Sequence, residues 1–258
     1  MNQCQLLIRI INIKVQMKKV IIIGATSGIG YELAKGYVKK GWRVGVAGRR
    51  IETLEIFKSS APDQIEIEQI DVTETDSPQQ LQRLIDKVGG MDLFILSAGV
   101  GSQNRKLNPD IELATAQTNV VGFIRMVTFA YQYFKEQRKG HLAVISSIAG
   151  TKGLGVAPAY SATKGFQNLY IDALAQLAHM EKQPVVFTDI RPGFVETALL
   201  KTGTYPMLMK PDRVARKIMK SIKRKERVVV IDKRYAIIVF FWRLIPRWIW
   251  ERISISNK

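Results

Sequence analysis

The stretch V-I-I-I-G-A-T-S-G-I-G at residues 20–30 decides the fold class. Its first four residues form a continuous apolar run, which is typical of a strand buried on both faces of a sheet. Gly24, Gly28 and Gly30 then allow a tight turn, and helical spacing of apolar residues begins at Ile29. A strand, a glycine turn and a helix in this order present free backbone N–H groups to a phosphate anion. The alternative is a simple turn without a ligand.

The alternation of apolar runs and helical patterns continues along the chain. The runs predict seven strands, at 20–23, 43–47, 65–70, 93–96, 142–145, 185–190 and 228–231. Helical spacing predicts helices between them, at 29–40, 78–88, 113–137, 159–180 and 213–224. Strands that alternate with helices form a mainly parallel sheet with right-handed crossovers. We therefore expect a single α/β domain over residues 17–232, followed by a basic, apolar tail at 233–258.

The composition excludes several classes of protein. The 258 residues are 47% apolar and 24% charged, which argues against a disordered chain. Cys4 is the only cysteine, so a disulfide framework is excluded, and we expect no metal site from His141 and His179, which we interpret as structural or solvated. The net charge is +17, and residues 201–258 hold 16 Lys and Arg against 4 Asp and Glu. This excess favours anionic partners.

Residues 1–16 are apolar with two scattered basic residues. They are too short and too interrupted to span a bilayer, and they lack the ordered regions of a signal peptide. We interpret them as an N-terminal extension, with Met17 as the functional start. The alternative is that Met1 is the true start.

Tyr160 and Lys164 carry the chemistry that we expect. They lie one helical turn apart and so share a face of the helix predicted at 159–180. A phenol has a pKa of about 10, and a neighbouring ammonium lowers that pKa toward the range in which proton exchange is efficient. A surface pair is the alternative, because this spacing is common by chance. Ser147, which ends a strand 13 residues before Tyr160, and Asn119, in the preceding helical region, favour the catalytic interpretation.

The loop G-x3-G-x-G, Asn119, Ser147 and Y-x3-K together resemble the short-chain dehydrogenase/reductase family over about residues 18–231. The resemblance implies a Rossmann-type, doubly wound fold and hydride transfer between a nicotinamide cofactor and a carbonyl group. It implies that Tyr160 is the general acid in reduction and the base in oxidation. Lys164 lowers the pKa of that tyrosine and holds the nicotinamide ribose. Ser147 orients the substrate carbonyl, and Asn119 positions a water that links Lys164 to the proton supply.

The end of the second predicted strand indicates which cofactor is used. Arg49 and Arg50 follow it, and no acidic residue occurs before Glu52. A carboxylate at this place would hold the ribose hydroxyls of NAD, whereas a guanidinium pairs with a 2′-phosphate. We therefore predict NADP(H). The alternative is that both arginines are solvated at the start of a helix.

The resemblance assigns further cofactor contacts after several strands. Asp71 and Val72 border the adenine, although an Asp after a strand is also a common turn residue. The predicted cofactor contacts are Gly24, Thr26, Ser27, Gly28, Ile29, Gly30, Arg49, Arg50, Asp71, Val72, Ala98, Gly99, Tyr160, Lys164, Pro192, Gly193, Val195 and Thr197. Ile23 and Ser97 stand where the family usually has Thr and Asn. We expect the first departure to leave cofactor binding intact, and the second to affect a structural hydrogen bond rather than the chemistry.

Two C-terminal segments concern the substrate and partners. By resemblance, residues 198–209 are the substrate lid, and their Leu and Met content favours an apolar substrate; packing against the body is the alternative. The tail has eight apolar residues before Arg243, too few to span a bilayer, and Pro246 predicts two helical pieces. Its three tryptophans and basic residues suit an anionic membrane surface. A cap over the substrate cleft or a dimer contact is the alternative.

The sequence therefore predicts an NADPH-dependent oxidoreductase that reduces a ketone or oxidises a secondary alcohol. We expect its substrate to be apolar, lipid-like or 3-oxoacyl, bound by Ser147 and Tyr160. We expect a cytoplasmic homodimer or homotetramer, peripheral at a membrane if the tail binds lipid, with no nucleic-acid partner. The alternatives are a non-catalytic NADP(H)-binding regulator and a membrane-associated scaffold.

Overall fold

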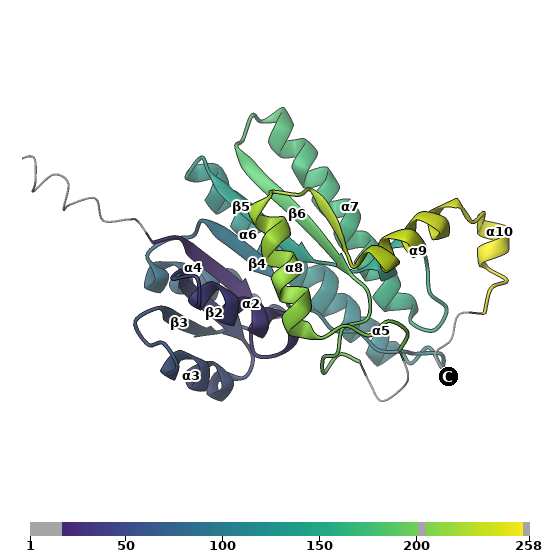
Figure 1. The fold of residues 1–258 in the computed structure, drawn as a ribbon, viewed down its shortest axis with the longest axis horizontal. Coiled ribbons are helices and arrows are strands. Elements are labelled where there is room, and N and C mark those ends of the chain that lie inside the picture. The colour runs from purple at the N-terminus through teal and green to yellow at the C-terminus, as the bar shows by residue number, and fades with distance from the viewer. Residues whose placement is uncertain (1–16, 201–204, 255–258) are drawn as a thin grey trace, which may run out of the picture.

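The computed structural model describes residues 17–200 and 205–254, and its seven strands form one parallel sheet (Figure 1). The sheet order is β3-β2-β1-β4-β5-β6-β7, so the chain winds outward from β1 in both directions. The strands are β1 (Lys19–Ile23), β2 (Arg43–Gly48), β3 (Ile65–Gln69), β4 (Leu93–Leu96), β5 (Gly140–Ile145), β6 (Val185–Pro192) and β7 (Val228–Ile231). The predicted doubly wound α/β fold and all seven strands are confirmed. The predicted extension at 1–16 lies outside the described residues.

Helices cover both faces of the sheet because β1 is apolar on both sides. Val20 and Ile22 point into one core, and Ile21 and Ile23 point into the other. The first core is covered by α2 (Gly28–Val38), α3 (Ile51–Ser59) and α8 (Pro211–Lys223). The second is covered by α4 (Ser77–Val88), α6 (Phe123–Glu136) and α7 (Pro158–Met180). This alternation explains why the strand signal is a continuous apolar run.

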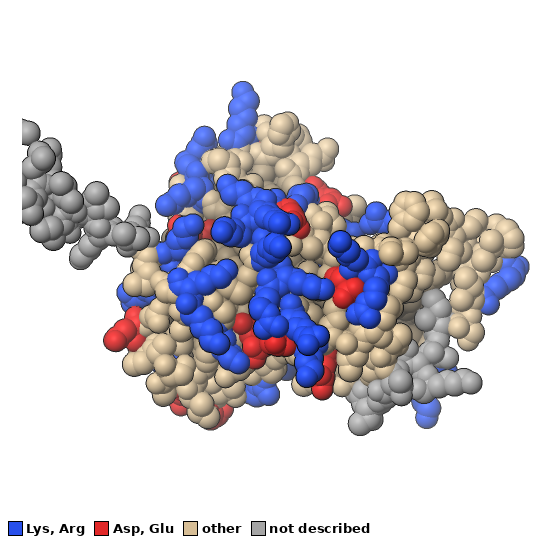
Figure 2. Space-filling model, in the orientation of Figure 1, with Lys and Arg blue, Asp and Glu red and all other residues tan. Residues whose placement is uncertain are grey.

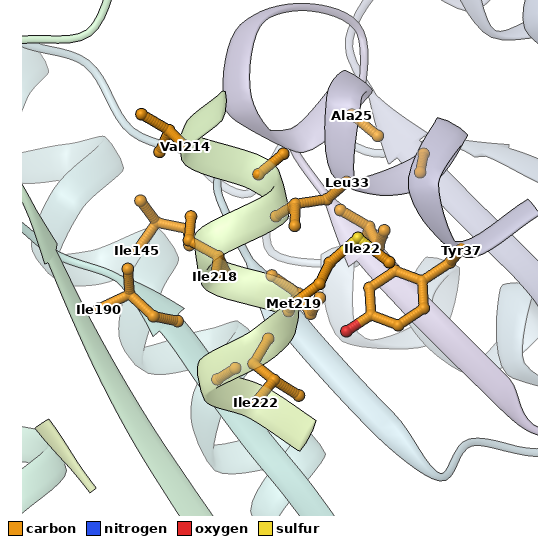
Figure 3. Close-up of a cluster of buried hydrophobic side chains, with 14 of the residues drawn as sticks. Ile22, Ala25, Leu33, Tyr37, Ile145, Ile190, Val214, Ile218, Met219 and Ile222 are labelled. Carbon is orange, nitrogen blue, oxygen red and sulfur yellow. The ribbon is translucent and has the colours of Figure 1, made fainter. Parts of the chain in front are cut away.

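Helix α8 is amphipathic, and its two faces have different neighbours. Met219 points toward Leu33 and Tyr37 of α2, while Ile218 lies on the side of Ile145 and Ile190 (Figure 3). The opposite face gathers a band of basic side chains over α8 (Figure 2), contributed by Arg213, Arg216, Lys217, Lys220 and Lys223. Much of the C-terminal positive charge therefore lies on the folded domain rather than on the tail.

Two helical regions differ from the sequence prediction. Helix α3 was not predicted, because its nine residues follow the arginines without a capping signal. The region predicted as one helix at 113–137 consists of α5 (Pro109–Ala116), a π-helical turn η1 (Gln117–Gly122) and α6. The start is earlier because Asn108 caps α5: its side chain accepts a hydrogen bond from the Asp110 N–H at 2.9 Å.

The tail forms two helices, α9 (Lys233–Leu244) and α10 (Arg247–Trp250), as Pro246 predicts. Ile245 before this proline is extended, which ends α9. In Figure 1 both helices extend from the side of the domain that carries β7. Among the described residues, the structure contains no helix with the length and apolar character needed to cross a bilayer.

Candidate active site

Three glycines after β1 form a cradle that no side chain could share. Gly24 has a φ of +86°, and a Cβ there would lie 2.5 Å from the backbone nitrogen of Ala98. A Cβ on Gly30 would lie 2.2 Å from the carbonyl oxygen of Gly24. Ser27, the residue before α2, makes no side-chain capping hydrogen bond in the described chain, so no Ser27 cap occupies the N–H groups of the first turn. This arrangement fits the pyrophosphate of a dinucleotide.

The cradle lies at the point where the strand order reverses. Strand β1 adjoins both β2 and β4, and the Ser97 N–H after β4 donates to the Ile23 carbonyl at 2.8 Å. Ala98 and Gly99 follow at once, so they line the same edge of the sheet. Open α/β sheets bind ligands at such a reversal, outside the carboxyl ends of the strands.

The end of β2 is cationic beside the cradle. Arg50 Nη2 donates to Thr26 Oγ1 at 2.9 Å. Arg49 and Arg50 are both exposed. A Cβ on Gly48 would lie 2.7 Å from the Thr26 side chain, so the turn and the strand end are in close contact. The Arg50 guanidinium is therefore held against the glycine turn, and Arg49 is the exposed residue before it.

Asp71 and Val72 follow β3, and their side chains have partners within the chain. Asp71 Oδ1 accepts hydrogen bonds from the Thr73 N–H at 3.0 Å and from the Thr73 hydroxyl at 2.7 Å. Val72 is buried and fills the space beside Gly122, where a Cβ would lie 2.6 Å from its methyl group. One carboxylate oxygen of Asp71 thus stabilises the local turn. Contact of Asp71 and Val72 with the adenine of the cofactor stays a prediction.

The adjacent serines after β5 have different surroundings. Ser146 Oγ donates to Asp189 Oδ1, and the other oxygen of Asp189 accepts from Arg191 Nε at 2.7 Å. All three residues are buried under the site. Ser147 Oγ accepts from the Ala149 N–H at 3.1 Å and lies 3.5 Å from the Pro192 carbonyl oxygen. Ser146 is therefore structural, whereas Ser147 adjoins the loop after β6.

Tyr160 and Lys164 lie on the inner face of α7. The Lys164 Nζ is 5.9 Å from the centre of the Tyr160 ring. Burial raises the pKa of Tyr160, and its hydrogen bond with Ser147 lowers that pKa by less. Burial lowers the pKa of Lys164 to about 8, while Asp189 opposes this shift. The expected lowering of the Tyr160 pKa by Lys164 is thus not seen, because burial is the largest cause of the shift and Ser147, rather than Lys164, is the group that opposes it.

Asn119 connects α7 to the loop after β4. Its Oδ1 accepts from the Val100 N–H at 2.9 Å, and its Nδ2 donates to the Val100 carbonyl at 2.7 Å and to Thr163 Oγ1 at 3.1 Å. Its own carbonyl accepts from Gln167 Nε2 at 2.9 Å, and Gln167 Oε1 accepts from Lys164 Nζ at 2.9 Å. Asn119 and Lys164 are thus brought together through the buried Gln167 side chain.

The loop after β6 folds back over the start of α2. A Cβ on Gly28 would lie 3.0 Å from the Thr197 methyl group. Val195 forms an isolated parallel bridge with Met209, which ties this loop to the end of the lid segment. Pro192 ends β6, and Gly193 lies against a side chain of α9. Residues 201–204 of the predicted lid lie outside the described residues.

A family model described as short chain dehydrogenase matches residues 18–205. The chain belongs to the short-chain dehydrogenase/reductase family. An uncharacterized oxidoreductase of Myxococcus xanthus is 34% identical over 193 residues, which cover 72% of this chain and 76% of that protein. The protein is therefore a dehydrogenase/reductase that acts on CH–OH or C=O groups of a small-molecule substrate with an NAD(P)(H) cofactor.

Solved structures of two oxidoreductases have the same fold. A 3-ketoacyl-(acyl-carrier-protein) reductase from Brucella melitensis complexed with NADH matches with a TM-score of 0.75 and 23% identity, covering 83% of this chain and 96% of that one. A closed form of serine dehydrogenase complexed with NADP+ matches with a TM-score of 0.74 and 24% identity, covering 82% and 92%. At these identities the likeness concerns the fold.

Two residues of this short-chain dehydrogenase/reductase site were missed from the sequence. Gln167 carries a usable signal, because it lies three residues after Lys164 and so on the same helical face. Tyr235 carries none, because it follows β7 and reaches Gly193 only through the tertiary fold. His141 lies within β5 and His179 within the last turn of α7. Within the described ranges, no group of three His, Cys, Asp or Glu side chains gathers as a metal ion would require.

Proposed function

We propose that the protein is an NADPH-dependent reductase of ketones, or a dehydrogenase of secondary alcohols, with Tyr160 as general acid and base. The observation that carries this proposal is the convergence of Ser147, Tyr160, Lys164 and Asn119 at the sheet edge that holds the glycine cradle. A non-catalytic regulator would need the cradle alone. The complete set of polar groups therefore favours turnover.

In the proposed reaction, each side chain has a separate task. Bound NADPH supplies the hydride. Tyr160 donates its phenolic proton to the carbonyl oxygen, and the raised pKa keeps that proton in place at neutral pH. Ser147 donates a hydrogen bond to the same oxygen and orients it. Lys164, with a pKa of about 8, is mainly charged at pH 7 and stabilises the phenolate as the proton leaves.

Preference for NADP(H) over NAD(H) rests on the cationic end of β2. Arg50 is anchored to Thr26, and Arg49 is exposed beside it, so a 2′-phosphate could accept hydrogen bonds from both. The similar solved structures contain either NADP+ or NADH, so they do not distinguish the two cofactors. The preference for NADP(H) therefore rests on Arg49 and Arg50. Replacing both arginines with Ala removes charge-assisted hydrogen bonds, each of which contributes about 1.5–3 kcal/mol. NADPH binding should weaken by at least about tenfold, while NADH binding changes little. Arg138→Ala, an exposed arginine at the opposite edge of the sheet, is the control.

An apolar substrate is supported by the surroundings of the segment after Ser147. Residues 151–156 and the tail line an open cleft of about 750 Å³ that begins four residues after Ser147; its lining includes Leu154, Val156, Trp250 and Ile253 but neither Ser147 nor Tyr160. Trp250 Nε1 donates to the Gly153 carbonyl at 2.8 Å, so α10 is fixed beside this segment. Arg105, Lys152 and Arg247 also line the cleft, against one acidic residue, Glu251, and this net positive lining suits an apolar substrate that carries an anionic group.

The test is NADPH oxidation followed by absorbance against a graded panel of carbonyl compounds, with NADH in parallel. The panel runs from small ketones through 3-oxoacyl thioesters and long-chain ketones to steroids. Turnover that favours one apolar class supports the reductase. Cofactor binding without turnover across the panel would instead favour the regulator, and turnover with NADH alone would overturn the role of the arginines.

We propose further that the tail attaches this otherwise cytoplasmic protein to an anionic membrane surface. Helix α9 buries Tyr235 and Val239, but its outer side chains Ile237, Phe240, Phe241 and Leu244 are each more than half exposed, as is Trp248. A cluster of exposed large apolar groups marks an interaction site. Arg243 and Arg247 lie beside it, and aromatic and basic residues together suit the lipid headgroup region.

Flotation with vesicles tests this attachment. The double variant Phe240→Ser, Phe241→Ser should lose binding to anionic vesicles and keep its activity on a soluble substrate. Ile56→Ser, at an exposed apolar residue of α3, is the matched control. If the double variant instead changes the mass of a homodimer or homotetramer measured by light scattering, the patch is a subunit contact and the membrane proposal is wrong.

A further inference from the structure

Gln167 links two residues of the site through a single carboxamide. Its Oε1 accepts from Lys164 Nζ at 2.9 Å, and its Nε2 donates to the Asn119 carbonyl at 2.9 Å. Only 1% of Gln167 is exposed. The orientation of the amide is defined by its partners, because the flipped form would set NH2 against an ammonium and oxygen against a carbonyl.

The local fold explains why the bridge forms. Gln167 lies one turn after Lys164 on α7, so both side chains project to the same side. Asn119 lies in the π-helical turn η1, and such turns commonly occur at functional sites. Thr163 accepts a hydrogen bond from the Asn119 side chain at 3.1 Å. Helix α7 therefore holds Asn119 at two points, through its side chain and through its carbonyl.

The bridge supplies one of two protein acceptors that the structure gives to the Lys164 ammonium. The other is the Ile145 carbonyl oxygen, at 3.1 Å. The remaining ionisable groups that face Lys164 are Tyr160 on its own helix and Asp189 on β6, and Asp189 is paired with Arg191. Because Lys164 is 4% exposed, each acceptor matters for keeping its charge in place.

We propose that Gln167 is a positioning residue that holds the Lys164 ammonium by direct contact, where the family resemblance puts a water molecule between Lys164 and Asn119. This inference rests on the proposed function, in which Lys164 stabilises the Tyr160 phenolate. Two of the three N–H donors of the ammonium then go to protein acceptors, Gln167 and the Ile145 carbonyl. A water molecule can exchange its protons, whereas a carboxamide retains them. Gln167 therefore positions Lys164 without carrying protons to it.

Two variants separate this role from simple packing. Gln167→Met keeps the length of the side chain and removes both hydrogen bonds. Gln167→Ala removes them too, but opens a polar space that a water can fill. We expect Gln167→Met to lower the pKa of Lys164 by about one unit, and Gln167→Ala to lower it less. If Gln167 only filled space, Gln167→Ala would shift the Lys164 pKa more than Gln167→Met, because the alanine leaves the larger cavity.

The measurement is NMR titration of the lysine side chains, with the Lys164 signal assigned by its loss in Lys164→Met. Asn168→Ala is the control, because Asn168 is the next residue and is buried but makes no hydrogen bond with Lys164 in the described chain. This control should leave the Lys164 pKa unchanged. An unchanged pKa in Gln167→Met, or a larger shift in Gln167→Ala, would overturn the proposal.

The titration needs neither substrate nor cofactor, so its result stands even if the proposed reductase activity is not found. Where activity is found, a second readout applies. The basic limb of the pH profile of kcat should move to lower pH in Gln167→Met by the same amount as the Lys164 pKa. A limb that stays in place while the pKa moves would show that Lys164 does not govern turnover, which contradicts the role proposed for Lys164 in the reaction and keeps the bridge.

Discussion

Tyr235 connects the C-terminal helix to the cofactor loop, and removing its hydroxyl tests that connection. The residue is 2% exposed. Its hydroxyl donates to the Pro206 carbonyl at 2.7 Å and accepts from the Phe194 N–H at 3.3 Å. Its ring fills the space beside Gly193, where a Cβ would lie 2.3 Å away. One side chain of α9 thus contacts the chain before the predicted lid, at Phe194, and within the lid, at Pro206.

The substitution Tyr235→Phe keeps the ring and removes both hydrogen bonds. No large cavity forms, so the loss comes from the hydrogen bonds alone. Each one contributes about 0.5–1.5 kcal/mol, and the Phe194 N–H is left partly buried without a partner. We expect the free energy of unfolding to fall by about 2 kcal/mol. For a domain of this size that corresponds to a drop in Tm of about 4–8 °C.

Denaturant unfolding and calorimetry measure this loss. Tyr37→Phe is the matched control, because Tyr37 is also 2% exposed but its hydroxyl makes no hydrogen bond within the described chain. That control should change the free energy of unfolding by less than about 0.5 kcal/mol. If Tyr235→Phe is no less stable than Tyr37→Phe, the hydroxyl does not hold the lid segment and the tail is not part of the site.

Three further predictions concern the Ser147 hydroxyl, His141 and the glycine cradle. Ser147→Ala should lower kcat by about 10²–10³ and leave cofactor binding nearly unchanged, which stopped-flow and fluorescence titration can separate. Burial lowers the pKa of His141 to about 4, below that of the unfolded chain, so its stabilising contribution is present above about pH 6.5 and is lost as the pH falls. Wild type should therefore lose about 2 kcal/mol between pH 7 and pH 5 that His141→Gln does not lose, as measured by unfolding at both pH values; equal losses would contradict this. Gly30→Ala should abolish NADPH binding, because its Cβ would meet the Gly24 carbonyl oxygen; retained affinity would show that the cradle is not the phosphate site.

The strands and the site residues could be predicted from the sequence for a common physical reason. Strands buried on both faces are continuous apolar runs, so β1 and β4 are visible without tertiary information. Parallel strands place their carboxyl ends at one edge. Ser147 and the glycine turn, each of which follows a strand, are therefore expected to meet there.

Other features depend on contacts that no local pattern encodes. The π-helical turn at Asn119 interrupts a region whose apolar spacing suggests one helix. The contact of Tyr235 with Gly193 joins segments 42 residues apart in the chain. The direction of the Tyr160 pKa shift is set by burial, which the spacing of Tyr160 and Lys164 in the sequence does not show. These differences all arise at the tertiary level, where neighbours distant in sequence decide the outcome.

The central claim is that Tyr160 supplies the proton that accompanies hydride transfer. The most direct measurement is the single-turnover rate of NADPH oxidation by wild type and by Tyr160→Phe, on the best substrate of the carbonyl panel. General acid catalysis contributes about 10²–10⁴ in rate, so the variant should slow by that factor while its NADPH affinity stays the same. A variant that binds NADPH normally and reduces the substrate at the wild-type rate would contradict the mechanism.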